Sequence, residues 1–246
     1  MIITSRSNDR VKSARALQDA KGRKSSGLHL IEGDKLVSDA IESGARVVTV
    51  FAREDAPSFD GIETVRVSES VMDAISSART AQNLCAVVET PDCACPDRYA
   101  QGLWIALDRL QDPGNLGTII RTADALGAAG VLISDDSADP FSPKALRAAM
   151  GSTYHLPIAI GSLEPELKKL KEQGFVCVCG HLKGSETLPA IERNAVLVVG
   201  NEGQGVSEAT AALCERYRMP MRGRAESLNA AVFAALMMQT ILNGMS

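Results

Sequence analysis

The sequence predicts an α/β protein whose second half is built on a parallel β-sheet, and three observations lead to this prediction. Short apolar runs alternate with amphipathic segments along most of the 246 residues. Apolar residues make up 45% of the chain, enough for one large domain or two of ordinary size. A polar stretch with two prolines separates two such series. We therefore expect a small α/β domain at residues 1–90, a linker at 91–102 and a second domain at 103–246.

The first domain is expected to begin with a basic amphipathic helix. Ser7 and Asn8 have the short polar side chains that cap helix N-termini, and we expect the helix to end near Gly22. Beyond it, changes of hydrophobic period predict a short series of alternating elements. The predicted strands are 28–32, 47–51 and 84–88, and the predicted helices are 34–43 and 69–77.

The second domain repeats the alternation of strand and helix over a longer stretch. The predicted strands are 103–107, 131–134, 156–160, 175–179, 196–199 and 217–219, and the predicted helices are 116–126, 143–150, 164–172, 207–213 and 228–242. Apolar strands that alternate with helices indicate a parallel sheet covered on both faces. The run Ala230–Met238 has no polar residue and is too short to span a bilayer, so we expect it in a core or a subunit interface.

The charge of the chain is unevenly distributed. Residues 1–24 hold seven basic and two acidic side chains, a net charge of +5, whereas the whole chain carries −4. A cationic segment attracts phosphate backbones by releasing counterions, whatever the mean charge of the protein. We therefore interpret Arg10, Lys12 and Arg15 as candidate RNA-binding residues. Charge alone supports the alternative, a solvated helix face, equally well.

Two further features bound the class of protein. No apolar run reaches the roughly 20 residues that span a bilayer and no leader sequence opens the chain, so we expect a cytoplasmic protein without membrane contact. The six cysteines are too few for a disulfide scaffold. The closest pairs, Cys93 with Cys95 and Cys177 with Cys179, lack the wider spacing usual for structural zinc. We expect reduced, buried thiols and no metal.

Glycine-rich turns that directly follow strands are the places to search for a ligand site, because parallel sheets bind ligands beyond the carboxyl ends of their strands. The first such turn leads into a helix that carries Asn115 near its start and Arg121 six residues later. This spacing is a little under two helical turns, so the two side chains can lie on similar faces. Taken alone, Asn115 is better explained as a helix cap and Arg121 as a surface ion pair.

The second turn, Gly200–Gly205, follows an apolar strand and has three glycines in six residues. Such a loop lets a ligand approach the backbone closely. Its G-x-x-G-x-G spacing is not the dinucleotide fingerprint, and the chain has no G-x-x-x-x-G-K-[ST] phosphate loop. The pattern therefore weakens the hypothesis of an α/β enzyme that uses NAD or ATP.

The third turn ends in Ser227-Leu228-Asn229, directly before the apolar C-terminal helix. Ser227 is suited to cap that helix. Asn229 is harder to explain in this way, because a polar amide in the first turn of an otherwise apolar helix needs a hydrogen-bond partner. We therefore treat Asn229 as a candidate functional residue.

Together the three turns resemble the signature motifs of the SpoU (TrmH-like) branch of the SPOUT RNA methyltransferases. The N-x5-R element stands as Asn115 and Arg121, the N-E-G-x-G element as Asn201–Gly205, and the P-M-x-G…S-L-N element as Pro220–Asn229. Residues 142–152 also resemble the stretch between the first two motifs. The resemblance is strong from Leu103 to the end of the chain.

Two other stretches bear on the resemblance. In the first domain, Leu30–Gly33 and the helix after it resemble more loosely the family's ribosomal-protein-like RNA-binding domain. One position departs from the pattern, because Ala230 and Ala231 stand where the family usually has valine and serine. That departure removes a second hydroxyl and leaves Ser227 and Asn229 as the polar pair.

The resemblance implies S-adenosylmethionine-dependent 2'-O-methylation of ribose in structured RNA, and the separate first domain favours ribosomal over transfer RNA. It also implies a deep trefoil knot in the second domain, the cofactor bound in that knot, and a homodimer as the active unit. The implied cofactor contacts are Gly200, Asn201, Gly203, Gly205, Met219, Met221 and Leu228, and the implied catalytic residues are Asn115, Arg121, Glu202, Ser227 and Asn229.

The chemistry sets its own requirements. A sulfonium methyl is already activated, so the enzyme must hold a hydroxyl in line with it, help to remove a proton and exclude water, with no need for a metal. The histidines lie outside the motifs, so a histidine base is not expected. Arg121 is expected to stabilise the developing alkoxide or to position the adjacent phosphate, and the base itself stays open.

The main alternative function is a catalytically silent RNA-binding module that keeps the fold. The presence of Asn115, Arg121, Glu202 and Asn229 argues against it. The RNA and the nucleotide that would be modified are not encoded in any pattern of the sequence.

Overall fold

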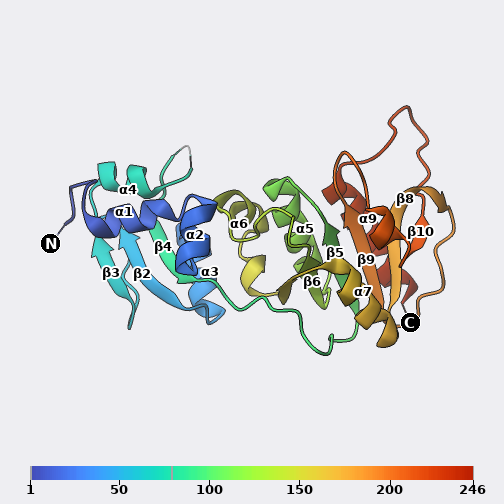
Figure 1. Cartoon of the computed structure of the whole chain (residues 1–246). Coiled ribbons are helices and arrows are strands. Elements are labelled where there is room, and N and C mark those ends of the chain that lie inside the picture. The colour runs from blue at the N-terminus through green and yellow to red at the C-terminus, as the bar shows by residue number, and fades with distance from the viewer. Residues whose placement is uncertain (1, 79, 246) are drawn as a thin grey trace. The chain divides into compact units, whose positions relative to one another are not determined.

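The computed structural model describes residues 2–78 and 80–245, and the chain divides into two compact units (Figure 1). The first unit comprises Met1–Asp92 together with Asp139–Tyr154, and the second comprises Cys93–Ala138 and His155–Ser246. Asp139–Tyr154 therefore clusters with the first unit, although the sequence analysis assigns it to the second domain. Most of the expected linker clusters with the second unit.

The first unit is built on a four-stranded sheet in the order β1-β4-β2-β3. β4 is antiparallel to β1 and β2, whereas β3 is parallel to β2. The strands are β1 (Leu28–Glu32), β2 (Val47–Ala52), β3 (Glu63–Arg66) and β4 (Leu84–Glu89). The sequence analysis missed β3, because Val65 is its one apolar residue and a single buried position gives no readable period.

The basic N-terminal segment forms two short helices, so the prediction of one helix ending near Gly22 is wrong. α1 (Asp9–Ala16) is capped by the Asn8 side chain, which accepts a backbone N–H of the first turn at 3.0 Å. Gly22 lies inside α2 (Ala20–Ser26), where a Cβ would fall 1.9 Å from the carbonyl oxygen of Ala16. The glycine therefore permits the close approach of the two helices and does not end the first one.

The other helices of the first unit follow the predicted pattern closely. They are α3 (Asp34–Glu42) and α4 (Glu69–Ile75), each within two residues of the predicted bounds. α1 and α4 share one hydrophobic cluster with the sheet, in which Val11, Phe51 and Met72 are almost completely buried. Burial of such side chains is the main contribution to the stability of a unit of this size.

Buried polar contacts hold the segment Asp139–Tyr154 within the first unit. The segment contains α6 (Pro143–Ala149) and a 3-10 turn, Ser152–Tyr154. Asp139 Oδ2 lies 2.7 Å from Nε of Arg23, whose side chain is only 7% exposed. The fully buried His29 lies 2.7 Å from the Tyr154 hydroxyl through Nε2 and 3.2 Å from Thr90 through Nδ1. Loss of one partner would leave a buried polar group unpaired, so these contacts fix the segment firmly.

The second unit contains a six-stranded sheet in the order β10-β8-β9-β5-β6-β7, in which all neighbouring strands are parallel. The predicted parallel α/β fold is thus confirmed. The strands are β5 (Leu103–Asp108), β6 (Gly130–Ile133), β7 (Ile158–Ile160), β8 (Val176–Ser185), β9 (Ala195–Gly200) and β10 (Glu215–Tyr217). β8 runs six residues further than predicted, because its exposed second half still pairs with β10.

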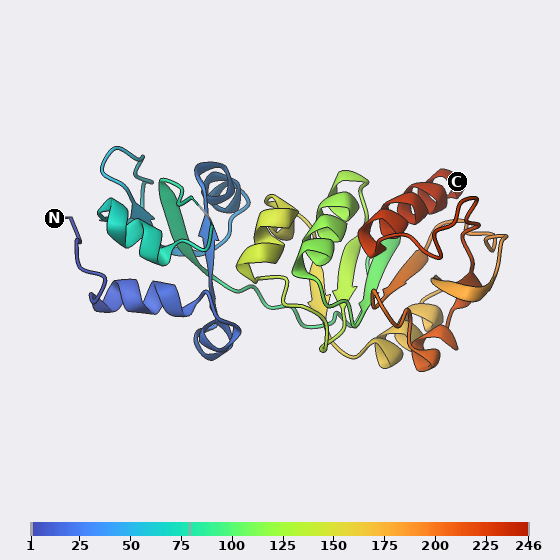
Figure 2. The same ribbon diagram turned by 90° about the horizontal axis from the view of Figure 1, so that it is seen from above.

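Helices cover both faces of this sheet (Figure 2). α5 and α9 lie on one face and pack against each other, and α7 and α8 lie on the opposite face. Their bounds are α5 (Pro113–Ala125), α7 (Leu163–Glu172), α8 (Glu208–Ala211) and α9 (Ala230–Gly244). α9 buries Ala234 and Met238 but leaves Val232 and Leu236, one turn apart, about half exposed.

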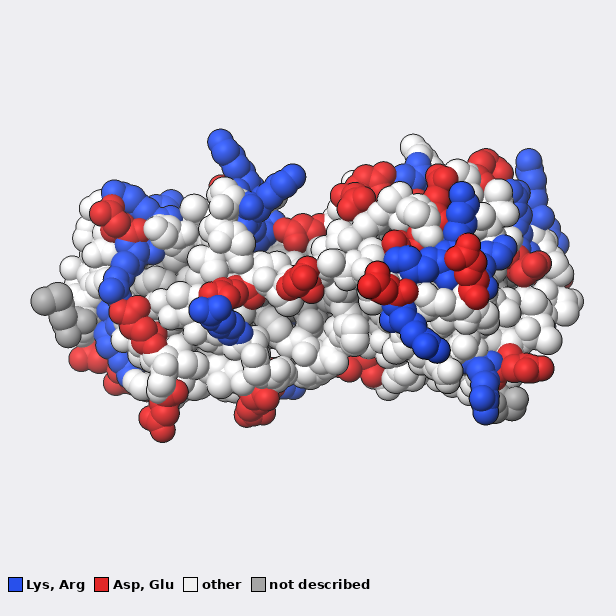
Figure 3. Space-filling model, turned by 60° about the horizontal axis from the view of Figure 1, so that its bottom comes forward, with Lys and Arg blue, Asp and Glu red and all other residues white. Residues whose placement is uncertain are grey.

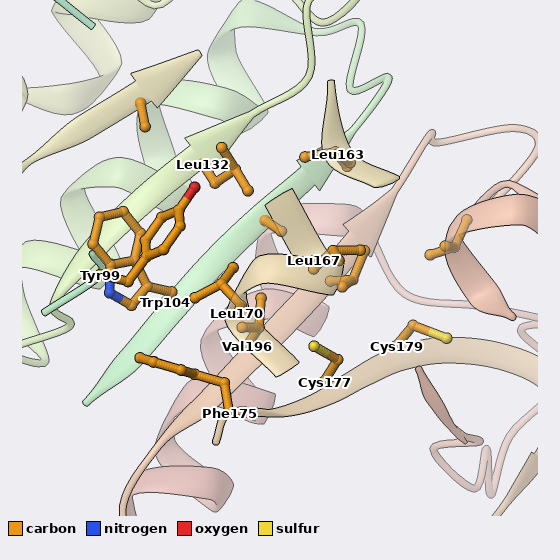
Figure 4. Packing of buried hydrophobic residues seen from close by; sticks show 14 of the residues in the cluster. Tyr99, Trp104, Leu132, Leu163, Leu167, Leu170, Phe175, Cys177, Cys179 and Val196 are labelled. Atoms are coloured by element: carbon orange, nitrogen blue, oxygen red, sulfur yellow. The ribbon is translucent and has the colours of Figure 1, made fainter. Parts of the chain in front are cut away.

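The core under α7 is shown in Figure 4. Leu163, Leu167 and Leu170 of the helix meet apolar side chains of the sheet, and Tyr99 packs edge-on against Trp104 with ring centroids 4.9 Å apart. Cys177 and Cys179 are buried there as free thiols. Among the described residues no cluster of three His, Cys, Asp or Glu side chains is arranged to hold a metal, and no helix is long and apolar enough to cross a membrane.

Candidate active site

A pocket of about 830 Å³ opens at the carboxyl ends of β5, β8 and β9. β5 and β9 are neighbours, and Asp108 at the end of one pairs with Gly200 at the end of the other. The turns that follow these strands, which carry the first two sequence motifs, therefore start side by side. All residues that line the pocket belong to the second unit.

Glu202 joins the glycine-rich turn to the start of α5. Its carboxylate accepts the backbone N–H groups of Gln111 at 3.2 Å and Asp112 at 3.0 Å, and the side-chain amide of Asn115 at 3.1 Å. Partial burial works to raise the pKa of Glu202, but the hydrogen bonds from Asn115 and the backbone outweigh it and hold the pKa below its usual value. Glu202 is thus an ionised acceptor at neutral pH.

A side-chain hydrogen bond connects the first motif to the third. The Asn229 amide donates to Oδ1 of Asn115 at 3.0 Å, and its own Oδ1 accepts the N–H groups of Ala231 and Val232. Asn229 is therefore the N-cap of α9, a position that the sequence analysis suggested for Ser227. Because each amide has one end fixed by a defined partner, Glu202, Asn115 and Asn229 form a chain of three oriented side chains.

The glycine-rich turn is closed tightly on itself. Asn201 and Gly205 exchange backbone hydrogen bonds of 3.1 and 2.8 Å, and the Asn201 side chain accepts the N–H groups of Gly203 and Gln204. A Cβ at Gly200 would lie 2.2 Å from the backbone nitrogen of Val206. This position requires glycine, and the turn presents backbone to the pocket.

The remaining pocket walls combine apolar and polar side chains. Predicted cofactor residues Gly200, Asn201, Gly203, Gly205, Met219, Met221 and Leu228 all line the pocket, as do Glu202, Ser227 and Asn229. A backbone-lined loop with apolar walls fits a nucleoside cofactor such as S-adenosylmethionine, and the volume lies in the range of small-molecule sites.

Several pocket residues were missed by the sequence analysis. Arg109, His181 and Phe233 line the pocket but lie outside the three motif elements. Gln204 also lines it, at the variable position of the second element. The Phe233 ring packs against Gly180, where a Cβ would lie 2.5 Å from it. In the sequence, a glycine after an apolar strand is only a weak indication of such a contact. No local sequence pattern indicates that Arg109 lines the pocket.

Arg121 is not part of this pocket within one chain. Arg121 lies on α5 with an exposed side chain, and within the described part of the chain that side chain has no hydrogen bond or ion pair. Asn115, by contrast, is joined to two pocket residues, although it does not itself line the wall. The structure therefore brings together four of the five predicted catalytic residues around one pocket.

The predicted RNA-binding residues lie on α1 of the first unit. Arg10 forms an ion pair of 2.7 Å with Glu63, and Lys12 forms one of 3.0 Å with Asp9. All four side chains are at least half exposed, so these pairs are weak and can be displaced. On the face drawn in Figure 3, acidic and basic side chains are interspersed over the second unit as well.

The comparison with protein families follows the same division of the chain. The profile of the SpoU rRNA Methylase family matches residues 102–239. The chain belongs to the SpoU rRNA methylase family. This SpoU methylase also matches the profile of the MRM3-like substrate binding domain over residues 8–86. It is therefore an RNA methyltransferase whose N-terminal domain is of the substrate-binding type.

Relatives of this SpoU methylase match it over nearly their whole length. The 23S rRNA (guanosine(2553)-2'-O)-methyltransferase RlmP of Bacillus subtilis (strain 168) is 37% identical over 247 residues, which cover 96% of each chain. An AdoMet-bound rRNA methyltransferase from Sinorhizobium meliloti has a TM-score of 0.90 at 34% identity and covers 99% of this chain and 97% of that one. AviRb from Streptomyces viridochromogenes, in complex with AdoMet, has a TM-score of 0.84 at 27% identity and covers 96% and 97%.

Proposed function

We propose that this SpoU methylase transfers the methyl group of S-adenosylmethionine to a ribose 2'-hydroxyl of ribosomal RNA, with the cofactor in the pocket at β5, β8 and β9. One observation carries the proposal: Glu202, Asn115 and Asn229, from three separate motifs, are hydrogen-bonded in a chain at that pocket. The relatives named for rRNA 2'-O-methylation and for bound AdoMet support it. The cytoplasm, which the sequence analysis predicts, is where such an RNA would be met.

The residues of the site meet two requirements of methyl transfer, the positioning of the hydroxyl and the exclusion of water. S-adenosylmethionine supplies a methyl group that its sulfonium already activates. The backbone of the glycine-rich turn holds the cofactor, and Asn115, fixed at both ends, orients the ribose beside it. An apolar wall keeps water from the reacting hydroxyl, and it is formed by Val199, Leu228 and Phe233.

We propose that Arg121 acts across a homodimer, in the pocket of the partner subunit. Within one chain Arg121 is exposed and outside the pocket, although it lies on the helix that Asn115 begins. The half-exposed Val232 and Leu236 on the adjacent α9 offer an apolar stripe for a symmetric contact. A guanidinium brought in this way would stabilise the developing alkoxide or hold the neighbouring phosphate.

We propose that the chain after β10 forms the trefoil knot that the family resemblance implies. β10 is an edge strand beside β8, whereas the next element, α9, packs against α5 and β9 near the middle of the sheet. Residues 218–229 must therefore return from the edge past the turn that follows β9. A crystallographic backbone trace tests the proposal: these residues should pass through the loop around Asn201–Gly205, and a path outside the loop would refute it.

The first unit is proposed to bind the RNA. Arg10, Lys12 and Arg15 lie on α1, and phosphates would have to displace Glu63 and Asp9 from the first two. α6 adds the exposed Lys144 and Arg147 to the same unit, and Arg147 donates to the neutral hydroxyl of Ser77 at 2.6 Å, so its charge stays available to a phosphate.

Two measurements test the proposed function. Isothermal titration should show S-adenosylmethionine binding, and ribose-methylation mapping should show one ribosomal RNA position that loses its methyl group in a strain lacking the protein. Restoration of that methyl group by the wild type but not by Asn115→Ala would assign the reaction to this site. A protein that binds RNA but not the cofactor would instead be a silent RNA-binding module.

A further inference from the structure

Arg109 has a backbone conformation that arginine rarely adopts. Its φ is +57°, in the left-handed region where a Cβ is crowded. Among the described residues other than glycine, only Met150 shares a positive φ. Glycine would occupy this position without strain, so an arginine side chain held there calls for a compensating contribution.

The guanidinium of Arg109 reaches the far end of the glycine-rich turn. Nη1 donates to the side-chain oxygen of Gln204 at 3.1 Å, and Nη2 lies 3.5 Å from the carbonyl oxygen of Gly205. Its Nε donates to Oδ1 of Asp108 at 3.2 Å. Because the planar guanidinium presents its donors as a rigid fork, one side chain can hold two successive residues of the turn at once.

The backbone of Arg109 holds the near end of the same turn. Its carbonyl oxygen accepts the side-chain amide of Asn201 at 3.0 Å, and its N–H donates to the hydroxyl of Ser134 at 2.9 Å. The positive φ turns the carbonyl and the side chain toward the same loop, which allows one residue to contact the turn at both ends.

The support behind Arg109 is buried. The Asp108 side chain is 5% exposed, and its second oxygen accepts the backbone N–H of Ser207 at 2.6 Å. Ser207 is the N-cap of α8, directly after the glycine-rich turn. Asp108 therefore fixes both the guanidinium and the exit of the turn, and Arg109 is held to rigid neighbours.

We propose that Arg109 is a positioning residue for the cofactor, which clasps the turn Asn201–Gly205 in its binding conformation before S-adenosylmethionine enters. The inference rests on the proposed function, because it takes that molecule as the occupant of the pocket. An ordered turn loses less conformational entropy on binding, so the clasp contributes to cofactor affinity and not to the chemical step.

Arg109→Gly separates this role from a structural one. Glycine relieves the backbone strain but leaves Oδ1 of the buried Asp108 without its guanidinium partner, and these opposing effects should leave the melting temperature little changed. The Kd for S-adenosylmethionine, measured by titration, should rise about tenfold, as expected for the loss of charge-assisted hydrogen bonds. KM for the cofactor should rise in parallel, whereas kcat at saturating cofactor should stay within about twofold.

Two further variants sharpen the measurement. Arg109→Lys keeps the charge and the strained backbone but has no fork, so it should also weaken cofactor binding, by about threefold or more. In combination with Gln204→Ala its effect should be less than additive, because both changes remove the same hydrogen bond. If Arg109→Gly fails to fold, Arg109→Lys and its combination with Gln204→Ala still test the clasp.

Met150→Gly is the matched control. It relieves the other positive φ, in the first unit, and Met150 does not line the pocket. Because Met150→Gly relieves strain without removing a polar contact, it should raise the melting temperature slightly and leave the Kd for S-adenosylmethionine unchanged.

Distinct results separate failure of the clasp from failure of the proposed function. A wild-type protein that does not bind S-adenosylmethionine would refute the proposed function. A wild-type protein that binds it, with unchanged Kd in both Arg109 variants, would refute only the clasp. A fall in kcat with unchanged KM would likewise overturn it, because Arg109 would then act in the chemical step.

Discussion

The two units use buried polar side chains for different purposes. In the first unit, Arg23 and His29 hold the segment Asp139–Tyr154 in place and lie outside the pocket described above. In the second unit, the buried Asp108 holds Arg109 and Ser207 on either side of a turn that lines a pocket. In both units the buried polar side chains have hydrogen-bond or ion-pair partners. What distinguishes the buried contacts of the second unit is that they hold a residue, Arg109, which itself lines the pocket.

The largest expected effect tests whether the second unit's site is completed by a residue of a second chain. Arg121→Ala and Asn229→Ala homodimers should each lose activity about 100-fold or more. Refolded together, they should form about half mixed dimers, each with one intact site of two, and recover roughly a quarter of wild-type activity. Mass spectrometry confirms the mixed dimers. Activity that stays at the level of the single variants would place both residues in one chain's site.

The second effect concerns the polar cluster of the first unit. Burial is the main cause that lowers the pKa of His29 from 6.5 to about 4, and Asp139 opposes it while Arg23 adds to it. Because the unfolded state binds this proton more readily, the stability contributed by neutral His29 is present above pH 6.5 and is lost as the pH falls toward 4. At pH 5 the loss should be about 2 kcal/mol.

Urea unfolding at pH 7 and pH 5 measures this contribution. The wild type should lose more unfolding free energy between the two pH values than His29→Gln, which removes the titrating group. The Tyr154 and Thr90 hydroxyls that face His29 do not ionise in this range, so they leave the comparison undisturbed. Equal losses in both proteins would show that His29 does not control acid stability.

The third effect compares two basic helices within the first unit. Arg147→Glu should lower RNA affinity by about threefold or more and reduce the salt slope by about one, because its partner Ser77 is neutral. Arg10→Glu should have a smaller effect, because Glu63 already neutralises the Arg10 side chain in part. Filter binding over a salt series measures both, and cofactor affinity should not change. An unaltered slope in the α6 variant would remove α6 from the RNA surface.

The smallest effect follows from the same ion pair. Glu63→Gln releases Arg10 from its partner and should strengthen RNA binding by about twofold at low salt, in line with the small value of exposed pairs. Glu42→Gln, which removes an equal charge from the exposed end of α3, is the control for net charge. Equal gains in both variants would mean that only the total charge matters.

The sequence predicted the fold best where apolar residues form long periodic runs. The buried strands β4, β5 and β9 lie within two residues of their predicted bounds. The sequence analysis did not predict β3 or the second half of β8, because exposed strands at or near a sheet edge have few apolar residues. The placement of Asp139–Tyr154 escaped as well, because its hydrophobic period predicts α6 but not the sheet on which α6 packs.

The candidate site was predictable to a similar depth. Motif spacing led to Asn115, Glu202 and Asn229, which the structure joins by hydrogen bonds. It could not lead to Arg109, because a left-handed φ at an arginine depends on contacts from distant segments and leaves no local signature. The family resemblance, and not the motif spacing, led to the prediction that Arg121 acts across a homodimer, since a helix position says which face a side chain shares and not what approaches that face.

The placement of Asp139–Tyr154 also bears on synthesis of the chain on the ribosome. His29 and Arg23 emerge early, but their partners Tyr154 and Asp139 follow only after β5, α5 and β6 have been translated. At roughly 5–20 residues per second, the nascent first unit waits several seconds with these groups uncovered. The first unit therefore completes its folding while the strands of the parallel sheet are still being synthesised. The two units fold during overlapping periods of translation.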